Sequence, residues 1–167
     1  PVFETVDRAD DETAVILYTS GTTGQPKGAE LMHRNLRDNA ALGTSLFGAD
    51  ASNPDTYLAV LPLFHIFGQT VIQNSAVMFG GTIVYLPRFE PTAARGLLAK
   101  EKVTFFAGVP TMYWGLLQAL AAADGAVDVA EIAAIMRTAV SGGAALPADI
   151  HRQFAEKFGI VIQEGYG

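Results

Sequence analysis

Apolar residues occur along this chain in two patterns: short continuous runs, and longer stretches in which they recur every three or four positions. The runs predict strands, and the spaced stretches predict helices. From residue 82 onward the two kinds of element alternate, which favours an α/β fold with a largely parallel sheet and helices on both faces. Strands are expected at 14–18, 28–32, 57–61, 82–86, 103–106, 138–141 and 160–163, and helices at 33–48, 63–79, 91–100, 111–122, 131–136 and 147–158.

Two of these elements are predicted to be buried. Residues 14–18 form an uninterrupted apolar run, as expected of a buried strand, and 63–79 is apolar on nearly every face, as expected of a helix inside a core. Residues 56–87 contain no Asp, Glu, Lys or Arg. Prolines, glycines and amides interrupt this span, so a buried strand–helix–strand explains it better than a transmembrane helix. Peripheral contact with a membrane is left open.

Composition limits the function classes. The chain has 167 residues, enough for one domain, and half of them are hydrophobic. A net charge of −6 without a basic cluster argues against a nucleic-acid partner. The absence of cysteine excludes disulfides and thiolate metal sites, and we predict no metal ligands. No signal-peptide pattern is visible, so we expect a cytoplasmic protein.

Residues 18–28 connect the first two strands and read Tyr-Thr-Ser-Gly-Thr-Thr-Gly-Gln-Pro-Lys-Gly. Glycines let backbone N–H groups approach an anion, hydroxyls donate short hydrogen bonds, and lysine adds a mobile positive charge. Each charge-assisted hydrogen bond would contribute about 1.5–3 kcal/mol. Pro26 precedes Lys27, so this is not the loop in which glycine precedes lysine and a helix follows. We interpret the segment as a polyphosphate cradle; an ordinary surface turn is the alternative.

Three further turns contain glycine and follow predicted strands. They are Gly108-Val109-Pro110-Thr111, Ser141-Gly142-Gly143-Ala144 and Glu164-Gly165-Tyr166-Gly167. Ligands of open α/β sheets bind beyond the carboxyl ends of the strands. One such turn alone would be an ordinary tight turn. Three at the same edge predict a crevice, where a flat ring lies against the backbone and Tyr166 offers an aromatic face.

His65 lies in the apolar stretch, between Phe64 and Ile66. It is either a core residue with a satisfied hydrogen bond or a gate between a nucleotide and an apolar tunnel. The surrounding span has no carboxylate that could neutralise a substrate ammonium group. We therefore expect a carboxylic acid substrate that is apolar beyond its carboxylate.

The string 19–28 resembles the signature phosphate loop of the adenylate-forming enzymes, the superfamily of acyl-CoA synthetases, luciferases and peptide-synthetase adenylation domains. It matches every position of the pattern Thr-Ser-Gly-Thr-Thr-Gly-x-Pro-Lys-Gly. The string 61–68, Leu-Pro-Leu-Phe-His-Ile-Phe-Gly, is similar to the acyl-activating branch; His65 stands where amino-acid-activating members have Asp. The Gly-Gly-Ala and Gly-Tyr-Gly turns resemble the family's adenine site. The likeness runs from residue 14 to 167 and implies part of the family's large N-terminal domain.

On this resemblance, the parent protein is an ATP-dependent fatty acid–CoA ligase. It would convert a carboxylate and Mg²⁺-ATP to acyl-AMP and pyrophosphate, and then form acyl-CoA with coenzyme A. Catalytic roles are implied for Lys27 and His65. Binding of the β- and γ-phosphates is implied for Thr19, Ser20, Gly21, Thr22, Thr23, Gly24 and Lys27. Adenine binding is implied for Gly142, Gly143, Ala144, Glu164, Gly165 and Tyr166. The acyl pocket would be lined by His65, Phe67, Gly108, Val109, Thr111 and Met112, although Met112 could equally be a core residue.

The predicted organisation is a single domain with a leading segment (1–13), a strand–phosphate loop–strand unit (14–32) and an α/β core (33–167). The chain begins without methionine, ends within a glycine-rich turn, and lacks the family's C-terminal domain with its catalytic lysine. We therefore expect a fragment that does not catalyse adenylation alone and that self-associates through surface exposed by truncation. An aryl-CoA ligase, another adenylate-former and a non-catalytic nucleotide-binding module stay open as alternatives.

Overall fold

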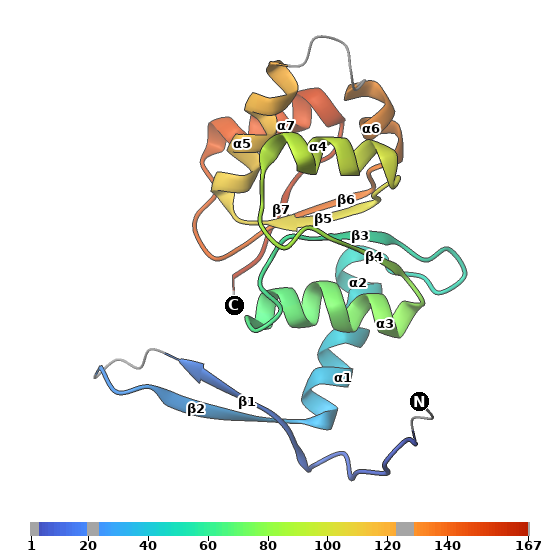
Figure 1. Ribbon diagram of the computed structural model, residues 1–167, viewed down its shortest axis with the longest axis vertical. Helices are drawn as coiled ribbons and strands as arrows, with labels where there is room; N and C mark the ends of the chain where they lie inside the picture. Colours follow the sequence, from blue (N-terminus) through green and yellow to red (C-terminus); the bar gives the residue numbers. More distant parts are fainter. Residues whose placement is uncertain (1–3, 20–23, 123–128, 167) are drawn as a thin grey trace.

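The computed structural model describes residues 4–19, 24–122 and 129–166. Its centre is a five-stranded sheet in the order β4-β3-β5-β6-β7 (Figure 1). Every neighbouring pair of strands in this sheet is parallel, which confirms the predicted fold class. The strands are β3 (Thr56–Ala59), β4 (Thr82–Tyr85), β5 (Phe105–Gly108), β6 (Thr138–Ser141) and β7 (Gln163–Glu164).

Helices cover both faces of the sheet, as Figure 1 shows. One face carries α4 (Pro91–Lys100), α5 (Pro110–Ala121), α6 (Val129–Ile135) and α7 (Ala148–Phe158). The other carries α2 (Gly43–Phe47), the π-helix η1 (Phe67–Asn74) and α3 (Ser75–Phe79). The helix α1 (His33–Ala41) packs against η1 and α3 on their side away from the sheet. Glu90 caps α4, and its carboxylate accepts hydrogen bonds from the backbone N–H groups of Thr92 and Ala93. These bonds hold the pKa of Glu90 below its usual value.

The core follows from the alternation of side chains along the strands, which sends successive residues to opposite faces. Phe105 packs against Tyr57 and against Phe47 of α2 on one face. Phe106 packs against Tyr113 of α5 on the other. The Tyr113 hydroxyl donates to the Val140 carbonyl at 2.8 Å, and burial raises the pKa of Tyr113 well above its usual value. Aromatic rings therefore join both helical layers to the central strands.

The predicted helices 33–48 and 63–79 differ from the structure. The first is broken into α1 and α2 beside Gly43, where an added Cβ would lie 3.2 Å from the Phe79 ring. The second is a turn followed by η1 and α3, and its predicted burial is wrong for Phe64 (84% exposed) and Val77 (75%). Ile72 on the same segment is fully buried, so only one side of it packs against the core. Within the described parts of the chain, no helix is long and apolar enough to cross a membrane.

Two predicted strands begin too early. β5 starts at Phe105 rather than at 103, because Thr104 turns its hydroxyl toward the side chain of Asp55 just before the ladder begins. β7 is limited to Gln163 and Glu164, which pair with Val140 and Ser141 at the edge of the sheet. The predicted strand 160–163 therefore overlaps β7 only at Gln163; just before it, Ile162 is buried and Val161 is exposed.

The first two strands form a separate antiparallel hairpin of β1 (Thr13–Thr19) and β2 (Lys27–Met32), drawn in dark blue in Figure 1. The prediction that 14–18 is a buried strand is wrong: Ile16 is 51% exposed and Tyr18 75%. A two-stranded ribbon has no second layer of its own, and no described element covers the Ile16 and Tyr18 side chains. The apolar run therefore predicts the strand correctly but not its surroundings.

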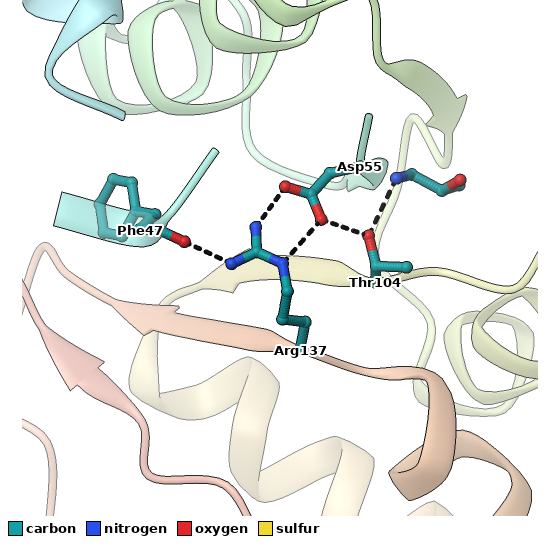
Figure 2. Close-up of polar contacts among 5 residues, drawn as sticks. Phe47, Asp55, Thr104 and Arg137 are labelled. Carbon is teal, nitrogen blue, oxygen red and sulfur yellow. Dashed lines mark hydrogen bonds and ion pairs between the residues drawn. The ribbon is translucent and has the colours of Figure 1, made fainter. Parts of the chain in front are cut away.

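A polar network joins the amino ends of the parallel strands (Figure 2). Asp55 precedes β3, and its buried carboxylate accepts from the Arg137 guanidinium through both oxygens. It also accepts from the Thr104 hydroxyl at 2.7 Å, and that hydroxyl accepts from the Thr56 backbone N–H at 3.0 Å. A further guanidinium N–H of Arg137 donates to the carbonyl of Phe47 in α2. The network therefore ties together β3, β5, β6 and α2 at one edge of the sheet.

Candidate nucleotide and acid site

The strand order reverses between β3 and β5, which lie side by side. After β3 the chain passes through η1 and α3 to β4, and after β5 it passes through α5 and α6 to β6 on the other side. Connections that leave two adjacent parallel strands in opposite directions open a crevice beyond their carboxyl ends. His65 follows β3 and Gly108 ends β5, so this crevice lies between two segments singled out in the sequence.

Backbone hydrogen bonds connect the three predicted glycine turns. The Gly142 N–H donates to the Gly108 carbonyl at 3.2 Å, and the Gly165 N–H donates to the Ser141 carbonyl at 2.8 Å. Gly143 has a φ of +79°, in the left-handed region that favours glycine. The turns after β5, β6 and β7 therefore lie side by side along one edge, as the sequence predicts.

A cleft of about 650 Å³ opens at this edge. It brings together six of the predicted site residues: His65, Phe67, Gly142, Gly143, Gly165 and Tyr166. Its volume is in the range of small-molecule sites. Of the described residues that line it, none is Asp, Glu, Lys or Arg. The cleft therefore combines an uncharged wall with exposed glycine backbone and the fully exposed ring of Tyr166.

His65 and Phe67 are held by local contacts. Nδ1 of His65 accepts the Phe67 backbone N–H at 3.2 Å, which leaves Nε2 for a ligand. His65 is exposed, which excludes the alternative of a buried core histidine. The Phe67 ring packs so closely on Gly142 that an added Cβ would lie 3.0 Å from it. A side chain at position 142 would therefore have to displace the Phe67 ring, so packing alone favours glycine there.

The remaining predicted residues of the acyl pocket do not line the cleft. Gly108 is buried, with Met112 Sδ 3.4 Å from its ideal Cβ position, and Thr111 is exposed on α5. Val109 lies behind the cleft wall, 3.5 Å from the ideal Cβ of Gly143. The sequence places these residues at the carboxyl edge of the sheet, but they lie where β5 ends and α5 begins, and the cleft there is lined instead by η1 and by the turns after β6 and β7.

Two predicted adenine contacts, Ala144 and Glu164, are exposed and do not line the cleft. The Glu164 carboxylate accepts the Leu146 backbone N–H at 3.3 Å and so holds the turn that follows β6. Leu146 is half-buried against the core. In this structure Glu164 therefore supports the turn rather than the cleft wall.

The predicted phosphate loop lies at the end of the hairpin. Thr19 and Lys27 are directly paired across β1 and β2, and Gly24 has a φ of +79°. Ser20, Gly21, Thr22 and Thr23 lie outside the described residues. Thr19, Gly24 and Lys27 are exposed and do not line the cleft; the other end of β2 reaches it through Leu31. Lys27 and the cleft-lining Leu31 therefore lie toward opposite ends of β2.

Sequence reasoning missed one wall of the cleft and the Asp55–Arg137 network. The missed wall comes from α1 and η1, where Asn35, Leu36, Asn39, Thr70 and Val71 line the cleft. Helical periodicity marks which side of a helix is apolar but not which partner it faces. The network carried a usable signal: Arg137 directly precedes the predicted strand 138–141, Asp55 lies two residues before the predicted strand 57–61, and the amino ends of parallel strands share one edge.

A family model described as "AMP-binding enzyme" matches residues 2–167. The chain belongs to the AMP-binding enzyme family. This membership agrees with the adenylate-forming resemblance of the phosphate loop. A solved member, apo MatB from Rhodopseudomonas palustris, has 37% sequence identity and a TM-score of 0.85, over 99% of this chain and 31% of its own. The ATP-bound form of MatB matches with a TM-score of 0.83 and the same coverage.

Two curated members differ in their acids. A long-chain-fatty-acid–CoA ligase of Bacillus subtilis is 33% identical over 98% of this chain, which spans 28% of that ligase. A feruloyl-CoA synthase of Amycolatopsis sp. is 35% identical over 94% of this chain, which spans 30% of that synthase. These two members are therefore an acyl-CoA ligase and an aryl-CoA ligase, and this chain corresponds to less than a third of the length of each.

Proposed function

We propose that this chain supplies the nucleotide and acid site of an ATP-dependent acid–CoA ligase, with a fatty acid as its substrate. The observation that carries the proposal is the cleft at the carboxyl edge, which joins the His65 turn to the glycine turns after β6 and β7. ATP bound to MatB, a relative with the same fold, supports a nucleotide as one occupant.

The chemistry requires one anion to attack another. A carboxylate oxygen bonds to the α-phosphorus of ATP, the bond from that phosphorus to the β-phosphate bridging oxygen breaks, and pyrophosphate leaves. Fixed N–H and hydroxyl donors and a lysine lower the activation barrier of this attack, because they stabilise the negative charge on the phosphates. The thiol sulfur of coenzyme A then attacks the acyl carbon of acyl-AMP, and AMP leaves. In this chain Lys27, Thr19 and Gly24 would contact the phosphates, His65 would face the carboxylate, and Tyr166 would stack on adenine.

The described residues contain no cluster of three or more His, Asp or Glu side chains that could hold a metal. Magnesium coordinates readily to nucleotide phosphates with few protein ligands. We therefore propose that Mg²⁺ binds to the phosphates of ATP, enters the site together with ATP and neutralises part of the phosphate charge.

The wall of the cleft supports an acid without a second charge. Ile66, Phe67 and Val71 give it apolar surface, and no lining residue in the described chain is Asp, Glu, Lys or Arg. A second carboxylate, an ammonium or a sulfonate would lose its hydration there without gaining a counter-ion. An aryl acid is the second candidate, because the Phe47 and Phe67 rings also line the cleft and a feruloyl-CoA synthase is among the relatives.

The proposal can be tested with a chimaera in which residues 14–167 replace the matching part of MatB. We expect the chimaera to exchange pyrophosphate into ATP with decanoate and not with malonate, and the 167-residue chain alone to show no exchange. A folded chimaera that responds to malonate alone would contradict the assigned acid class. If it bound ATP but responded to no acid, the chain would be a nucleotide-binding module without catalysis.

A further inference from the structure

Two hollows in the surface meet at helix α1, and the Leu36 side chain borders both of them. The first is the cleft at the carboxyl edge, which Leu36 lines together with Thr70 and Val71 of η1. The second has a volume of about 360 Å³ and lies between α1 and the η1–α3 segment, where Ala40 and Val77 line it. We call this second space the α1–α3 hollow. Among the residues that the structure describes, Leu36 is the one that lines both spaces.

Leu36 lies on the face of α1 that packs against its neighbours. It is half-buried, and Ala40, one helical turn later on the same face, is 2% exposed. The helix α1 packs against both η1 and α3. The Leu36 side chain therefore forms part of the partition between the cleft and the α1–α3 hollow.

The walls of the α1–α3 hollow suit a hydrocarbon. Val77 is 75% exposed and Met78 is 38% exposed, so both side chains present apolar surface to water. The charged residue that lines the hollow is Arg37, whose guanidinium donates to both Asp10 oxygens at 2.7 Å and to Asp38 at 2.9 Å. The charge of Arg37 is therefore balanced by neighbouring acids. An alkyl chain in the hollow would cover apolar surface and be stabilised by the hydrophobic effect.

We propose that Leu36 sets the maximum length of the acid substrate, because its side chain stops a hydrocarbon tail from passing out of the cleft into the α1–α3 hollow. The inference rests on the proposed ligase function and narrows its substrate class to acids of limited chain length. With the carboxylate at His65, the tail would run along η1 past Phe67 and Val71 toward Leu36. Methylene groups beyond Leu36 would stay in water and add no affinity.

The test measures the affinity of the 167-residue chain for unbranched saturated acids from hexanoate to tetradecanoate by calorimetry. Each methylene group buried in the cleft should raise the affinity about fourfold. We expect the affinity to rise in this way up to a limiting chain length and to stay constant beyond it. That limiting chain length is the quantity that substitutions at Leu36 should change.

Leu36→Ala and Leu36→Phe should move the limiting chain length in opposite directions. Leu36→Ala opens the partition, so acids longer by about two or more methylene groups should continue to gain affinity. Leu36→Phe fills the end of the cleft and should shorten the limiting chain length. Leu36→Ala also loses contacts with η1, so its urea midpoint should fall. Leu36→Phe keeps an apolar side chain in the partition, and its shift is measurable even if Leu36→Ala does not fold.

Val77→Asp is the matched control, because Val77 lines the α1–α3 hollow and not the cleft. Alone, it should leave the limiting chain length unchanged, and the urea midpoint too, since Val77 is 75% exposed. Combined with Leu36→Ala, it should cancel the gain for longer acids, because a tail that entered the hollow would desolvate the new carboxylate.

The same limiting chain length in the parent chain, Leu36→Ala and Leu36→Phe would overturn the role of Leu36 and leave the ligase proposal intact. A parent chain whose affinity rises all the way to tetradecanoate would also overturn it. So would a gain in Leu36→Ala that survives Val77→Asp, since the tail would then take another route. Failure of the folded chain to bind any acid would contradict both the Leu36 inference and the proposed function.

Discussion

The two ends of the parallel sheet use their polar groups in opposite ways. At the amino ends of the strands, Asp55, Thr104 and Arg137 satisfy one another, and Asp55 is almost fully buried by doing so. At the carboxyl ends, the glycine turns and η1 border an open cleft, and the Thr70 hydroxyl has no partner in the described chain. One end is closed by its own side chains, and the other has room for a ligand.

This contrast indicates that the chain separates stability from binding along the length of its strands. A buried ion pair that loses one partner leaves an uncompensated charge, so changes at the closed end should mainly unfold the protein. Exposed groups around a cleft contribute little to the packed core, so their removal should mainly alter ligand affinity, whereas a change that forces a packed turn at the open end to shift should reduce both affinity and stability. The predictions that follow test this separation, starting with the largest effect.

The largest effect is expected from Asp55→Ala. Removing this carboxylate leaves the Arg137 guanidinium and the Thr104 hydroxyl without their shared acceptor. We expect the free energy of unfolding to fall by about 3 kcal/mol, measured by urea denaturation. The matched control is Asp149→Ala, which breaks an exposed pair with Arg152 on α7 and should cost less than about 1 kcal/mol. Equal losses of unfolding free energy in the two variants would show that the Asp55 network does not stabilise the amino ends of the strands.

At the open end, Gly68→Ala should combine a stability loss with a binding loss. An added Cβ would lie 2.5 Å from the Pro62 carbonyl oxygen, so the turn that carries His65 must shift. Overpacking of this kind costs about 2 kcal/mol. In Gly96→Ala, the control, nothing lies within 4 Å of the new methyl group, and α4 should gain about 1 kcal/mol. A Gly68→Ala variant with unchanged stability would show that the turn is not tightly packed.

A smaller and pH-dependent effect is expected from Tyr57→Phe. Burial first, and the Asp55 charge second, raise the pKa of Tyr57 to about 12, so the folded state favours the neutral phenol. In the unfolded chain the phenol ionises near pH ~10, so its contribution is complete below that pH and is lost as the pH rises from about 10 to about 12. The loss should be on the order of 2 kcal/mol.

Thermal denaturation near neutral pH and at about pH 11 checks this prediction. The Tyr57→Phe variant should lose less stability than the parent chain between the two conditions. Tyr113 keeps its own raised pKa in both proteins, so it does not affect the comparison. If the parent chain and Tyr57→Phe lost the same stability at alkaline pH, the Tyr57 phenol would not be shielded from water in the folded state.

The fold could be predicted from the sequence where local pattern and environment agree. The β6 strand matches its predicted residues 138–141, which read Thr-Ala-Val-Ser, are all buried and run directly into the Gly142-Gly143 turn that ends the strand. The glycine turns at 142–143 and 165 were assigned to one edge by the same reasoning, since parallel strands end together. Chain order and residue type were sufficient for these features.

The sequence could not give what depends on the approach of distant segments. The sequence places Thr70 in an apolar helix, and its burial beside the cleft follows only from the packing of η1. The sequence predicts Gly108, Val109, Thr111 and Met112 in the acyl pocket, but they end β5 or begin α5, and none of them lines the cleft. The π-helical form of η1 likewise has no signal in apolar spacing, which does not distinguish five-residue from four-residue hydrogen bonding.

The central claim is that the open end of the sheet and its hairpin bind a nucleotide, and calorimetric titration with ATP tests it most directly. Lys27→Ala should weaken ATP binding at least about tenfold through loss of a charge-assisted contact, and Tyr166→Ala about tenfold through loss of stacking. Both side chains are exposed, so the urea midpoint should not change, and Lys157→Ala on α7 should leave both affinity and midpoint unchanged. Unchanged ATP affinity in both Lys27→Ala and Tyr166→Ala would contradict the account.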